Sequence, residues 1–237
     1  MKVIITGASA GIGAGIARVL AGEGFSLGLL ARSGDKLRAL CEEFDRNQPD
    51  GYAVHASAAC DLRDPQATET ALHALIDRLD GVDALINNAG VVIRKDVWEL
   101  TLDEWRTLVE TNLCGLFYAT RAVLPTMREQ RRGHLINVSS ISGRMPLPGG
   151  SAYAATKYAV AGFTESLFQE VRDFGIKATV LFPGSVDSAS HRHDPAADHS
   201  WKVKPEEVGL ACLDALNTAP GTCISRIEIR PLGRGPG

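Results

Sequence analysis

The segment Thr6-Gly7-Ala8-Ser9-Ala10-Gly11-Ile12-Gly13 decides the fold of this chain. It follows the apolar run at residues 2–5, which has the composition of a buried strand, and it leads into a helical pattern over residues 13–23. Glycines permit a tight turn and close backbone approach, and a helix start presents free N–H groups at the positive end of its dipole. The segment therefore predicts a turn that cradles the pyrophosphate of a dinucleotide, with an ordinary turn as the alternative.

Strand-like and helix-like segments alternate along the rest of the chain. The expected strands are residues 2–6, 26–31, 52–58, 84–87, 133–139, 177–182 and 223–228, and the expected helices are residues 13–23, 34–45, 65–79, 101–131, 150–174 and 205–215. This alternation predicts an α/β fold, a doubly wound, seven-stranded parallel sheet with helices on both faces. We expect one domain over residues 1–237, with the polar segment 185–204 as a loop near the site.

Composition narrows the class of partner. The chain has 237 residues, 45% of them hydrophobic, and a net charge of -3 with no long run of like charge, which argues against nucleic acid or an anionic membrane surface. No apolar stretch approaches the roughly 20 residues needed to cross a bilayer. We expect no signal peptide, because the first residues hold too few apolar side chains for its hydrophobic region. Five scattered cysteines suit free thiols in a reducing compartment. We expect a cytoplasmic protein that acts on a small molecule.

The spacing of Gly7, Gly11 and Gly13 differs from the Gly-x-Gly-x-x-Gly pattern of the best-known dinucleotide folds. Thr-Gly-x-x-x-Gly-x-Gly instead resembles the cofactor loop of the short-chain dehydrogenase/reductase family, and the resemblance extends over nearly the whole chain. It implies a Rossmann-type fold, NAD(P)(H)-dependent oxidoreductase activity and a homodimer or homotetramer. It assigns the following loop residues to the cofactor: Thr6, Gly7, Ser9, Ala10, Gly11, Ile12 and Gly13.

The end of the second expected strand indicates which cofactor binds. An NAD-preferring site places an acidic residue there, against the ribose 2′-hydroxyl, whereas this chain has Ala31 and Arg32. A guanidinium pairs well with a phosphate, so Arg32 predicts a preference for NADP(H), with NAD(H) as the lesser alternative. A solvated surface arginine is the competing interpretation.

Further cofactor contacts follow from the resemblance alone. It assigns Asp61 and Leu62 to the adenine ring, and it assigns Asn88, Ala89 and Gly90, within Asn87-Asn88-Ala89-Gly90, to the wall of the cofactor cleft. It assigns Pro183, Gly184, Val186 and Ser188 to the nicotinamide end, where Ser188 replaces the usual threonine but keeps a hydroxyl. The alternative role for Asp61 is a cap on the helix that begins near Pro65.

Tyr153 and Lys157 are four positions apart on an expected helix, so their side chains share one face. A nearby ammonium favours a phenolate, which predicts that Lys157 lowers the pKa of Tyr153 from its usual value near 10. The resemblance adds Ser140, preferred to Ser139, as a donor to the substrate oxygen, and Asn112 as the holder of a water in a proton relay. The implied reaction interconverts a carbonyl and a secondary alcohol by hydride transfer, with Tyr153 as general acid and base.

Two other functions remain open. The chain also resembles 3-oxoacyl-(acyl-carrier-protein) reductases, for which Arg131 and Arg132 would receive an acidic acyl carrier protein, although a basic helix end explains the same residues. Phe174 stands where a second basic anchor would be expected. A protein that senses NADP(H) without turnover is the third possibility, and the intact catalytic set argues against it. We expect no metal site, and we expect His191, His193 and His199 to line the loop at 185–204.

Overall fold

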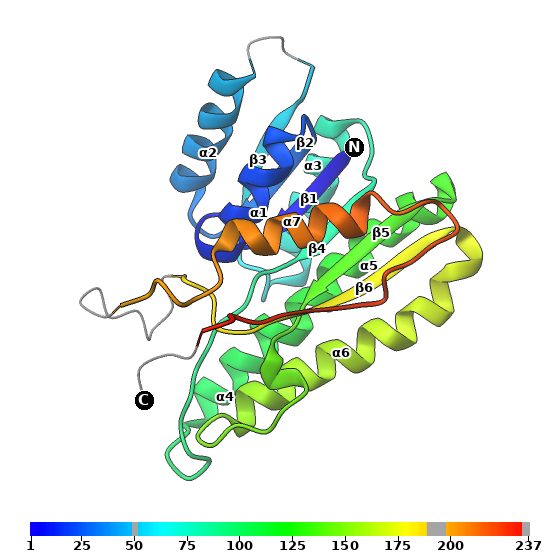
Figure 1. Cartoon of the computed structure of the whole chain (residues 1–237). Helices are drawn as coiled ribbons and strands as arrows, with labels where there is room; N and C mark the ends of the chain where they lie inside the picture. The colour runs from blue at the N-terminus through cyan, green and yellow to red at the C-terminus, as the bar shows by residue number, and fades with distance from the viewer. Residues whose placement is uncertain (49–51, 189–197, 234–237) are drawn as a thin grey trace.

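Seven parallel strands form one sheet in the computed structural model, which describes residues 1–48, 52–188 and 198–233 (Figure 1). The strands are β1 (Lys2–Thr6), β2 (Ser26–Ala31), β3 (His55–Ala59), β4 (Ala84–Asn87), β5 (Gly133–Val138), β6 (Ile176–Pro183) and β7 (Arg226–Ile229). Their order is β3-β2-β1-β4-β5-β6-β7. This is the predicted doubly wound fold, and the chain reverses its direction of travel across the sheet between β1 and β4.

Helices connect the strands. They are α1 (Gly11–Gly22), α2 (Gly34–Asn47), α3 (Pro65–Leu79), α4 (Leu102–Val109), α5 (Gly115–Gln130), α6 (Ser151–Val171) and α7 (Pro205–Leu216). A π-helical turn, η1 (Glu110–Cys114), joins α4 to α5, and short 3₁₀ turns stand at η2 (Ile141–Gly143) and η3 (Arg172–Phe174). Within the described ranges, none of the helices is both long and apolar enough to cross a membrane.

The sheet separates two hydrophobic cores, because side chains along a strand point alternately to its two faces. Val3 and Ile5 of β1 pack with Ile16 and Leu20 of α1 in a core shared with α2 and α7. Ile4 faces the opposite core, which is shared with α3, α5 and α6. Figure 1 shows α1 and α7 crossing in front of the sheet. Strands β1, β2, β4, β5 and β6 are therefore buried on both faces, whereas the edge strands β3 and β7 are only partly buried.

Polar side chains cap the first turns of α3 and α4. Asp64 is the N-cap of α3, its Oδ1 accepting a hydrogen bond from Ala67 N at 2.9 Å, and Pro65 occupies the first turn. Thr101 and Glu104 form a reciprocal capping box at α4. The alternative role of Asp61 as a helix cap is wrong, because Asp64 fills that position.

The structure corrects the expected helix over residues 101–131. The i→i+5 turn at Glu110–Cys114 interrupts it, so that one extra residue enters the helix between α4 and α5. A glycine follows directly, and a Cβ on Gly115 would lie 2.9 Å from Leu62 Cβ, so the interrupted helix packs tightly against the segment after β3. The third and seventh strands are also shorter than expected, at His55–Ala59 and Arg226–Ile229.

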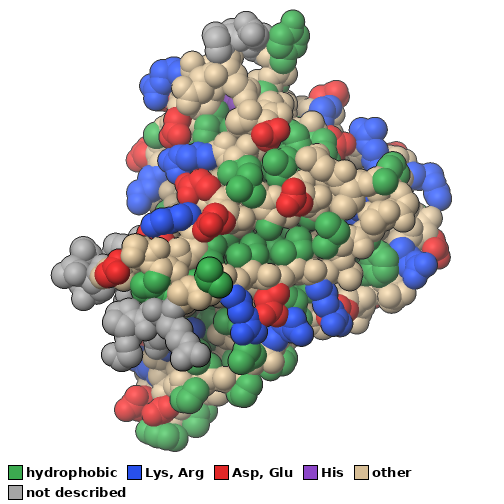
Figure 2. All heavy atoms as spheres, viewed as in Figure 1, with side chains coloured by type: hydrophobic (Ala, Val, Ile, Leu, Met, Phe, Trp, Pro, Cys, Tyr) green, Lys and Arg blue, Asp and Glu red, His purple; other side chains and the backbone are tan. Residues whose placement is uncertain are grey.

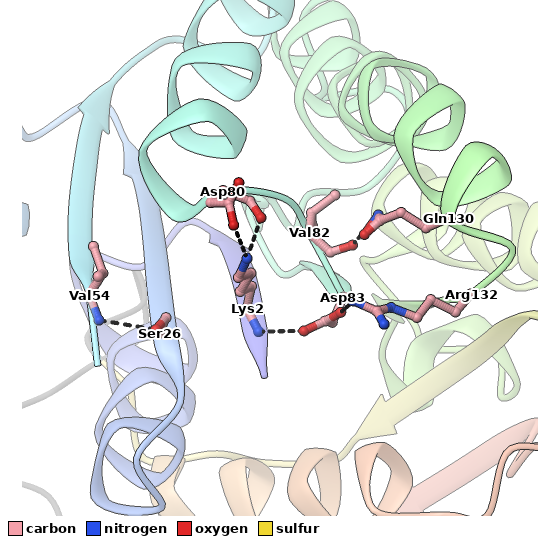
Figure 3. Close-up of polar contacts among 8 residues, drawn as sticks. All are labelled: Lys2, Ser26, Val54, Asp80, Val82, Asp83, Gln130 and Arg132. Atoms are coloured by element: carbon pink, nitrogen blue, oxygen red, sulfur yellow. Dashed lines mark hydrogen bonds and ion pairs between the residues drawn. The ribbon is translucent and has the colours of Figure 1, made fainter. Parts of the chain in front are cut away.

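The amino-terminal edge of the sheet is held by polar contacts (Figure 3). Lys2 donates its backbone N–H to Asp83 Oδ2 at 2.8 Å, and its ammonium pairs with Asp80 Oδ2 at 3.1 Å. Arg132 lies on the other side of Asp83, with Nη2 3.2 Å from Oδ1. These contacts join β1, β4 and the start of β5 at the edge opposite to the carboxyl ends of the strands. The carboxyl edge is left for the site.

Candidate functional site

A cavity of about 570 Å³ opens at the carboxyl ends of β1, β2 and β4. It lies where the strand order reverses, which is the usual ligand position in open α/β sheets. Its lining includes fourteen predicted site residues: Gly7, Ser9, Ala10, Gly11, Ile12, Arg32, Asp61, Leu62, Asn88, Ala89, Gly90, Tyr153, Lys157 and Ser188. One cavity thus brings together the glycine turn, the residue after β2 and the Tyr153–Lys157 pair.

Backbone conformation or close packing explains why glycine stands at each of the three positions in the turn. Gly7 and Gly11 have φ angles of 67° and 55°, which favour glycine. A Cβ on Gly13 would lie 2.3 Å from Gly7 O, so α1 can begin this close to the turn only without a side chain there. In this described segment, Ala10 gives α1 no side-chain cap and its first turn holds no acidic residue. Because Ala10, Gly11 and Ile12 line the cavity, the uncapped start of α1 borders it and suits an anion.

Thr6 and Gly13 support the turn instead of lining the cavity. Thr6 is 1% exposed, and its Oγ1 accepts hydrogen bonds from the backbone N–H groups of Asn88 and Ala89, at 3.1 Å each. Asn88 Nδ2 donates in return to Thr6 O at 3.1 Å and to Gly7 O at 3.3 Å. The ends of β1 and β4 are therefore fixed together beneath the cavity.

Arg32 and Asp61 face the cavity beyond β2 and β3. Arg32 is exposed, beside Ser33, which gives α2 no side-chain cap within the described chain. Arg63 donates to Asp61 in a bidentate pair, with Nη2 2.6 Å from Oδ2. This hydrogen bond, with further lowering from the charge of Arg32, holds the pKa of Asp61 below its usual range. The subsite therefore combines the solvent-facing guanidinium of Arg32 with an ionised carboxylate whose charge is balanced by Arg63.

Tyr153 and Lys157 lie on the first turns of α6, and both are almost fully buried. Lys157 Nζ lies 5.9 Å from the centre of the Tyr153 ring and donates to Val138 O at 2.9 Å. Burial lowers the pKa of Lys157 to about 8. Both side chains face the cavity, as the four-residue spacing predicts.

The expected lowering of the Tyr153 pKa is wrong for this structure. Burial raises the pKa of the phenol, because a buried phenolate loses its hydration, while a hydrogen bond with Ser140 and the charge of Arg94 lower it in part. The Lys157 ammonium donates its hydrogen bond to the Val138 carbonyl and not to the phenol. The phenol therefore keeps its proton at neutral pH, which suits a proton donor.

The two serines after β5 have different environments. Ser139 is 4% exposed, and its Oγ donates to Lys157 O at 2.8 Å, which ties the end of β5 to α6. Ser140 is partly exposed, accepts a hydrogen bond from Ser142 N at 3.2 Å and bonds the Tyr153 phenol. The Ser140 hydroxyl therefore lies beside the phenol, although it is not among the residues that line the cavity.

Asn112 lies in the π-helical turn η1 and is 1% exposed. Its Oδ1 accepts from Val91 N at 2.8 Å, and its Nδ2 donates to Val91 O at 3.0 Å and to Thr156 Oγ1 at 3.1 Å. Both amide hydrogens are thereby used. A water at this position would have to be held by the second lone pair of Oδ1 or by a main-chain carbonyl of the interrupted helix.

The segment after β6 contributes one lining residue of the four predicted. Ser188 lies against the glycine turn, since a Cβ on Gly11 would be 3.2 Å from Ser188 Cβ. Pro183 ends β6, and Gly184 N donates to Ile229 O at 2.7 Å beside it. Val186 forms a parallel bridge with Val203. The structure places these three behind the cavity lining.

The remaining sequence candidates lie elsewhere. Arg132 pairs with Asp83, and Arg131 donates to Asp173 O at 3.1 Å, at the edge of the sheet opposite to the cavity. Acyl carrier protein binding at these arginines stays a prediction. His199 lies 3.6 Å from Asp187 Oδ1, whereas His191 and His193 fall outside the described residues. Among the described residues, no three His, Cys, Asp or Glu side chains form a group suited to a metal.

The comparison with family models decides the identity of the fold family. Residues 1–198 match the model described as short chain dehydrogenase. The chain belongs to the short-chain dehydrogenase family. An "uncharacterized oxidoreductase" of Staphylococcus aureus (strain MRSA252) is 32% identical to it over 97% of this chain and 96% of the relative. This short-chain dehydrogenase is therefore an oxidoreductase, which confirms the predicted family and enzyme class.

Solved structures agree along almost the whole short-chain dehydrogenase. An alcohol dehydrogenase from the archaeon Thermococcus sibiricus, complexed with 5-hydroxy-NADP, superposes with a TM-score of 0.91 at 27% identity, covering 100% of this chain and 98% of that one. Serine dehydrogenase from Escherichia coli gives a TM-score of 0.85 at 31% identity, covering 98% of each chain. The match confirms the Rossmann-type fold.

Sequence reasoning on this short-chain dehydrogenase missed eight residues of the cavity lining. They are Ala31, Ser33, Cys60, Val91, Val92, Thr111, Val138 and Ser139. Each is next to a predicted residue or one position further along the chain, so the signal was proximity to the motifs. Thr111 lies in the π-helical turn, beside the predicted Asn112. All five cysteines, including Cys60, are free thiols.

Proposed function

We propose that this enzyme interconverts a carbonyl and a secondary alcohol with NADP(H), with Tyr153 as the proton donor and acceptor. The observation that carries the proposal is the shared cavity, in which the glycine turn, Arg32 and the Tyr153–Lys157 pair all face one space. A phosphate-binding turn at one end and a proton-exchanging pair at the other are the two parts that such a reaction needs.

The residues present fit a dinucleotide phosphate. The turn that Gly7, Gly11 and Gly13 form leaves room where a Cβ would clash, and the free N–H groups of α1 suit a diphosphate. Arg32 would pair with the 2′-phosphate, with the Ser33 hydroxyl beside it. When bound, NADPH supplies the hydride. The similar alcohol dehydrogenase from Thermococcus sibiricus, complexed with 5-hydroxy-NADP, supports this cofactor class.

The chain itself handles the proton and the oxygen of the substrate. Reduction develops negative charge on the carbonyl oxygen, and donors aimed at that atom stabilise the transition state. Tyr153, which burial keeps protonated, donates its proton there, and Ser140 donates a hydrogen bond to the same oxygen. Lys157 holds a positive charge within the buried site, and Asn112 occupies the inner end of a path that returns a proton from water.

A steady-state assay of NADPH oxidation tests the proposal, using a panel of ketones, sugars and 3-oxoacyl thioesters. We expect turnover of at least one ketone class, and we expect Tyr153→Phe to lower kcat by about 1,000-fold while NADPH still binds. Tyr158→Phe is the matched control, since Tyr158 lies on the same helix but is 46% exposed and outside the cavity lining. Its kcat should stay within about twofold of the wild type.

The same assay separates the other two functions. Turnover confined to 3-oxoacyl thioesters would identify a 3-oxoacyl-(acyl-carrier-protein) reductase. Tight NADPH binding without turnover of any compound in the panel would identify a sensor of NADP(H) and would overturn the proposed reaction. Equal turnover by the wild type and Tyr153→Phe would remove Tyr153 from the chemistry.

A further inference from the structure

We propose that Thr156 is a positioning residue that fixes Asn112 and the catalytic turn of α6 relative to each other. The inference rests on the proposed function of Tyr153 and Asn112. Thr156 lies between Tyr153 and Lys157 in the chain and is 2% exposed. Its Oγ1 donates to Tyr153 O at 2.8 Å and accepts from Asn112 Nδ2 at 3.1 Å. One hydroxyl therefore joins the π-helical turn to the backbone of the proton donor.

The contact continues to the wall of the cavity. Two hydrogen bonds join Asn112 to Val91. The Val91 N–H donates to Asn112 Oδ1 at 2.8 Å, and Asn112 Nδ2 donates to the Val91 carbonyl at 3.0 Å. Val91 lines the cavity directly after Gly90. Val91, Asn112, Thr156 and Tyr153 are thus joined by an unbroken series of hydrogen bonds between the cavity wall and α6, and Thr156 is the link to α6.

Loss of this link would disturb the proton path. Asn112 Oδ1 and Lys157 Nζ both converge on Gly90, at 3.1 Å and 3.5 Å from the place of an added Cβ. Without the Thr156 hydroxyl, one amide hydrogen of Asn112 would be buried with no partner, which proteins strongly avoid. Asn112 would then turn or shift, and its Oδ1 would leave the position beside Lys157.

The chain offers a matched control on the same helix. Thr164 is 1% exposed, donates to Val160 O at 2.6 Å and accepts from Asn137 Nδ2 at 2.9 Å. Thr164 therefore makes the same two kinds of hydrogen bond as Thr156, but its asparagine partner lies in the sheet interior and not in the site. A threonine hydroxyl that merely stabilises α6 would behave alike at both positions.

The experiment compares Thr156→Val, Thr156→Ser and Thr164→Val in the full-length protein. We expect Thr156→Val to lower kcat at least about tenfold while the Kd for NADPH, measured by fluorescence titration, stays within about twofold. Thr156→Ser keeps the hydroxyl and should restore kcat to within about threefold of the wild type. Thr164→Val should lower the unfolding midpoint in urea but leave kcat within about twofold.

A second measurement does not depend on turnover. Hydrogen–deuterium exchange at the Val91 amide should quicken in Thr156→Val and not in Thr164→Val, because that amide donates to Asn112 Oδ1. Equal effects of the two valine variants on kcat, or unchanged exchange at Val91 in Thr156→Val, would overturn the inference. Absence of turnover in the wild type would instead overturn the proposed function, and the exchange comparison would still decide the role of Thr156.

Discussion

The two cationic side chains of the site, Arg32 and Lys157, have opposite surroundings. Arg32 faces solvent at the entrance of the cavity, whereas Lys157 is 5% exposed and its pKa falls to about 8 through burial. An exposed guanidinium selects an anion at little cost to the fold. A buried ammonium carries a desolvation cost, which is a common feature of functional sites.

Replacing Lys157 by methionine should make the protein more stable and inactive. Its pKa is about 8 in the folded chain against about 10.4 when unfolded, so the unfolded chain binds more protons between these values and wild-type stability rises with pH across that window. At about pH 7, the variant should gain roughly 3 kcal/mol in unfolding free energy, as an upper value, and the gain should shrink toward about pH 10.

Urea unfolding at about pH 7 and pH 9.5 measures this difference between Lys157→Met and the wild type. Lys36→Met is the control, because Lys36 is exposed on α2 and its replacement should leave the difference near zero. A stability difference for Lys157→Met that does not change with pH would contradict the buried ammonium.

Arg32→Asp should change the choice of cofactor. Removing the guanidinium and adding a carboxylate should weaken NADPH by about 100-fold and leave NADH within a few fold, because only NADPH carries the 2′-phosphate. Arg46→Asp, at the other end of α2, makes the same charge change away from the cavity and is the control. Titration of both cofactors measures the effect, and equal weakening of the two would exclude the phosphate contact.

For single residues, the sequence predicts which side chains lie close together but not how far each one is exposed to water. The four-residue spacing correctly places Tyr153 and Lys157 on one face, because helical geometry is local. The phenol pKa moves in the opposite direction to the prediction, because burial outweighs the hydrogen bond with Ser140 and the charge of Arg94. Arg94, which no motif singled out, supplies the charge that acts on Tyr153.

The turns and helices differ in how far neighbouring residues in the sequence determine their conformation. The glycine turn is predictable, because its backbone demands glycine at fixed positions and α1 follows at once. The cap of α3 is less predictable, because Asp61 and Asp64 both precede Pro65 and only the structure shows that Asp64 caps the helix. The π-helical turn at Glu110–Cys114 is not predictable, because the residues there also suit a regular helix.

Gly13→Ala should abolish the nucleotide site. The new methyl group would lie 2.3 Å from Gly7 O, so α1 or the turn must move. We expect NADPH affinity to fall by about 100-fold and stability to fall by about 2 kcal/mol. Gly22→Ala, on the last turn of the same helix, has open space around it and should be neutral or stabilise by up to about 1 kcal/mol. Retained NADPH affinity in Gly13→Ala would contradict the close approach.

The whole molecule brings together parts that lie far apart in the chain. The cavity joins residues after β1, β2, β3 and β4 to residues on α6, so a bound dinucleotide would touch both halves of the sheet. Charges on the surface are mixed, and Figure 2 shows basic and acidic side chains interspersed on one face. We therefore expect a ligand to bind in the cavity and to stabilise the elements around it. Assembly into a homodimer or homotetramer stays a prediction.

NADPH should therefore stabilise the entire chain. At 100 times its Kd, a ligand that binds only the folded state adds about 2.7 kcal/mol, which for a chain of this size raises Tm by roughly 5–10 °C. Thermal unfolding with NADPH, and with NADH at the same concentration, measures the shift, which should be smaller for NADH. Arg32→Asp should lose most of the NADPH shift. A Tm that neither nucleotide moves would contradict binding in the cavity.

The π-helical turn also fixes the number of residues that can stand between α4 and α5. Each residue in a helix turns the face by about 100°, so the extra residue at Glu110–Cys114 acts as a phase shift between α4 and α5. Deleting one residue there would put the two helices back in phase and rotate either Asn112 or the core face of α5 out of place. Point substitutions keep the phase, so this short turn should tolerate a change of side chain far better than a change of count.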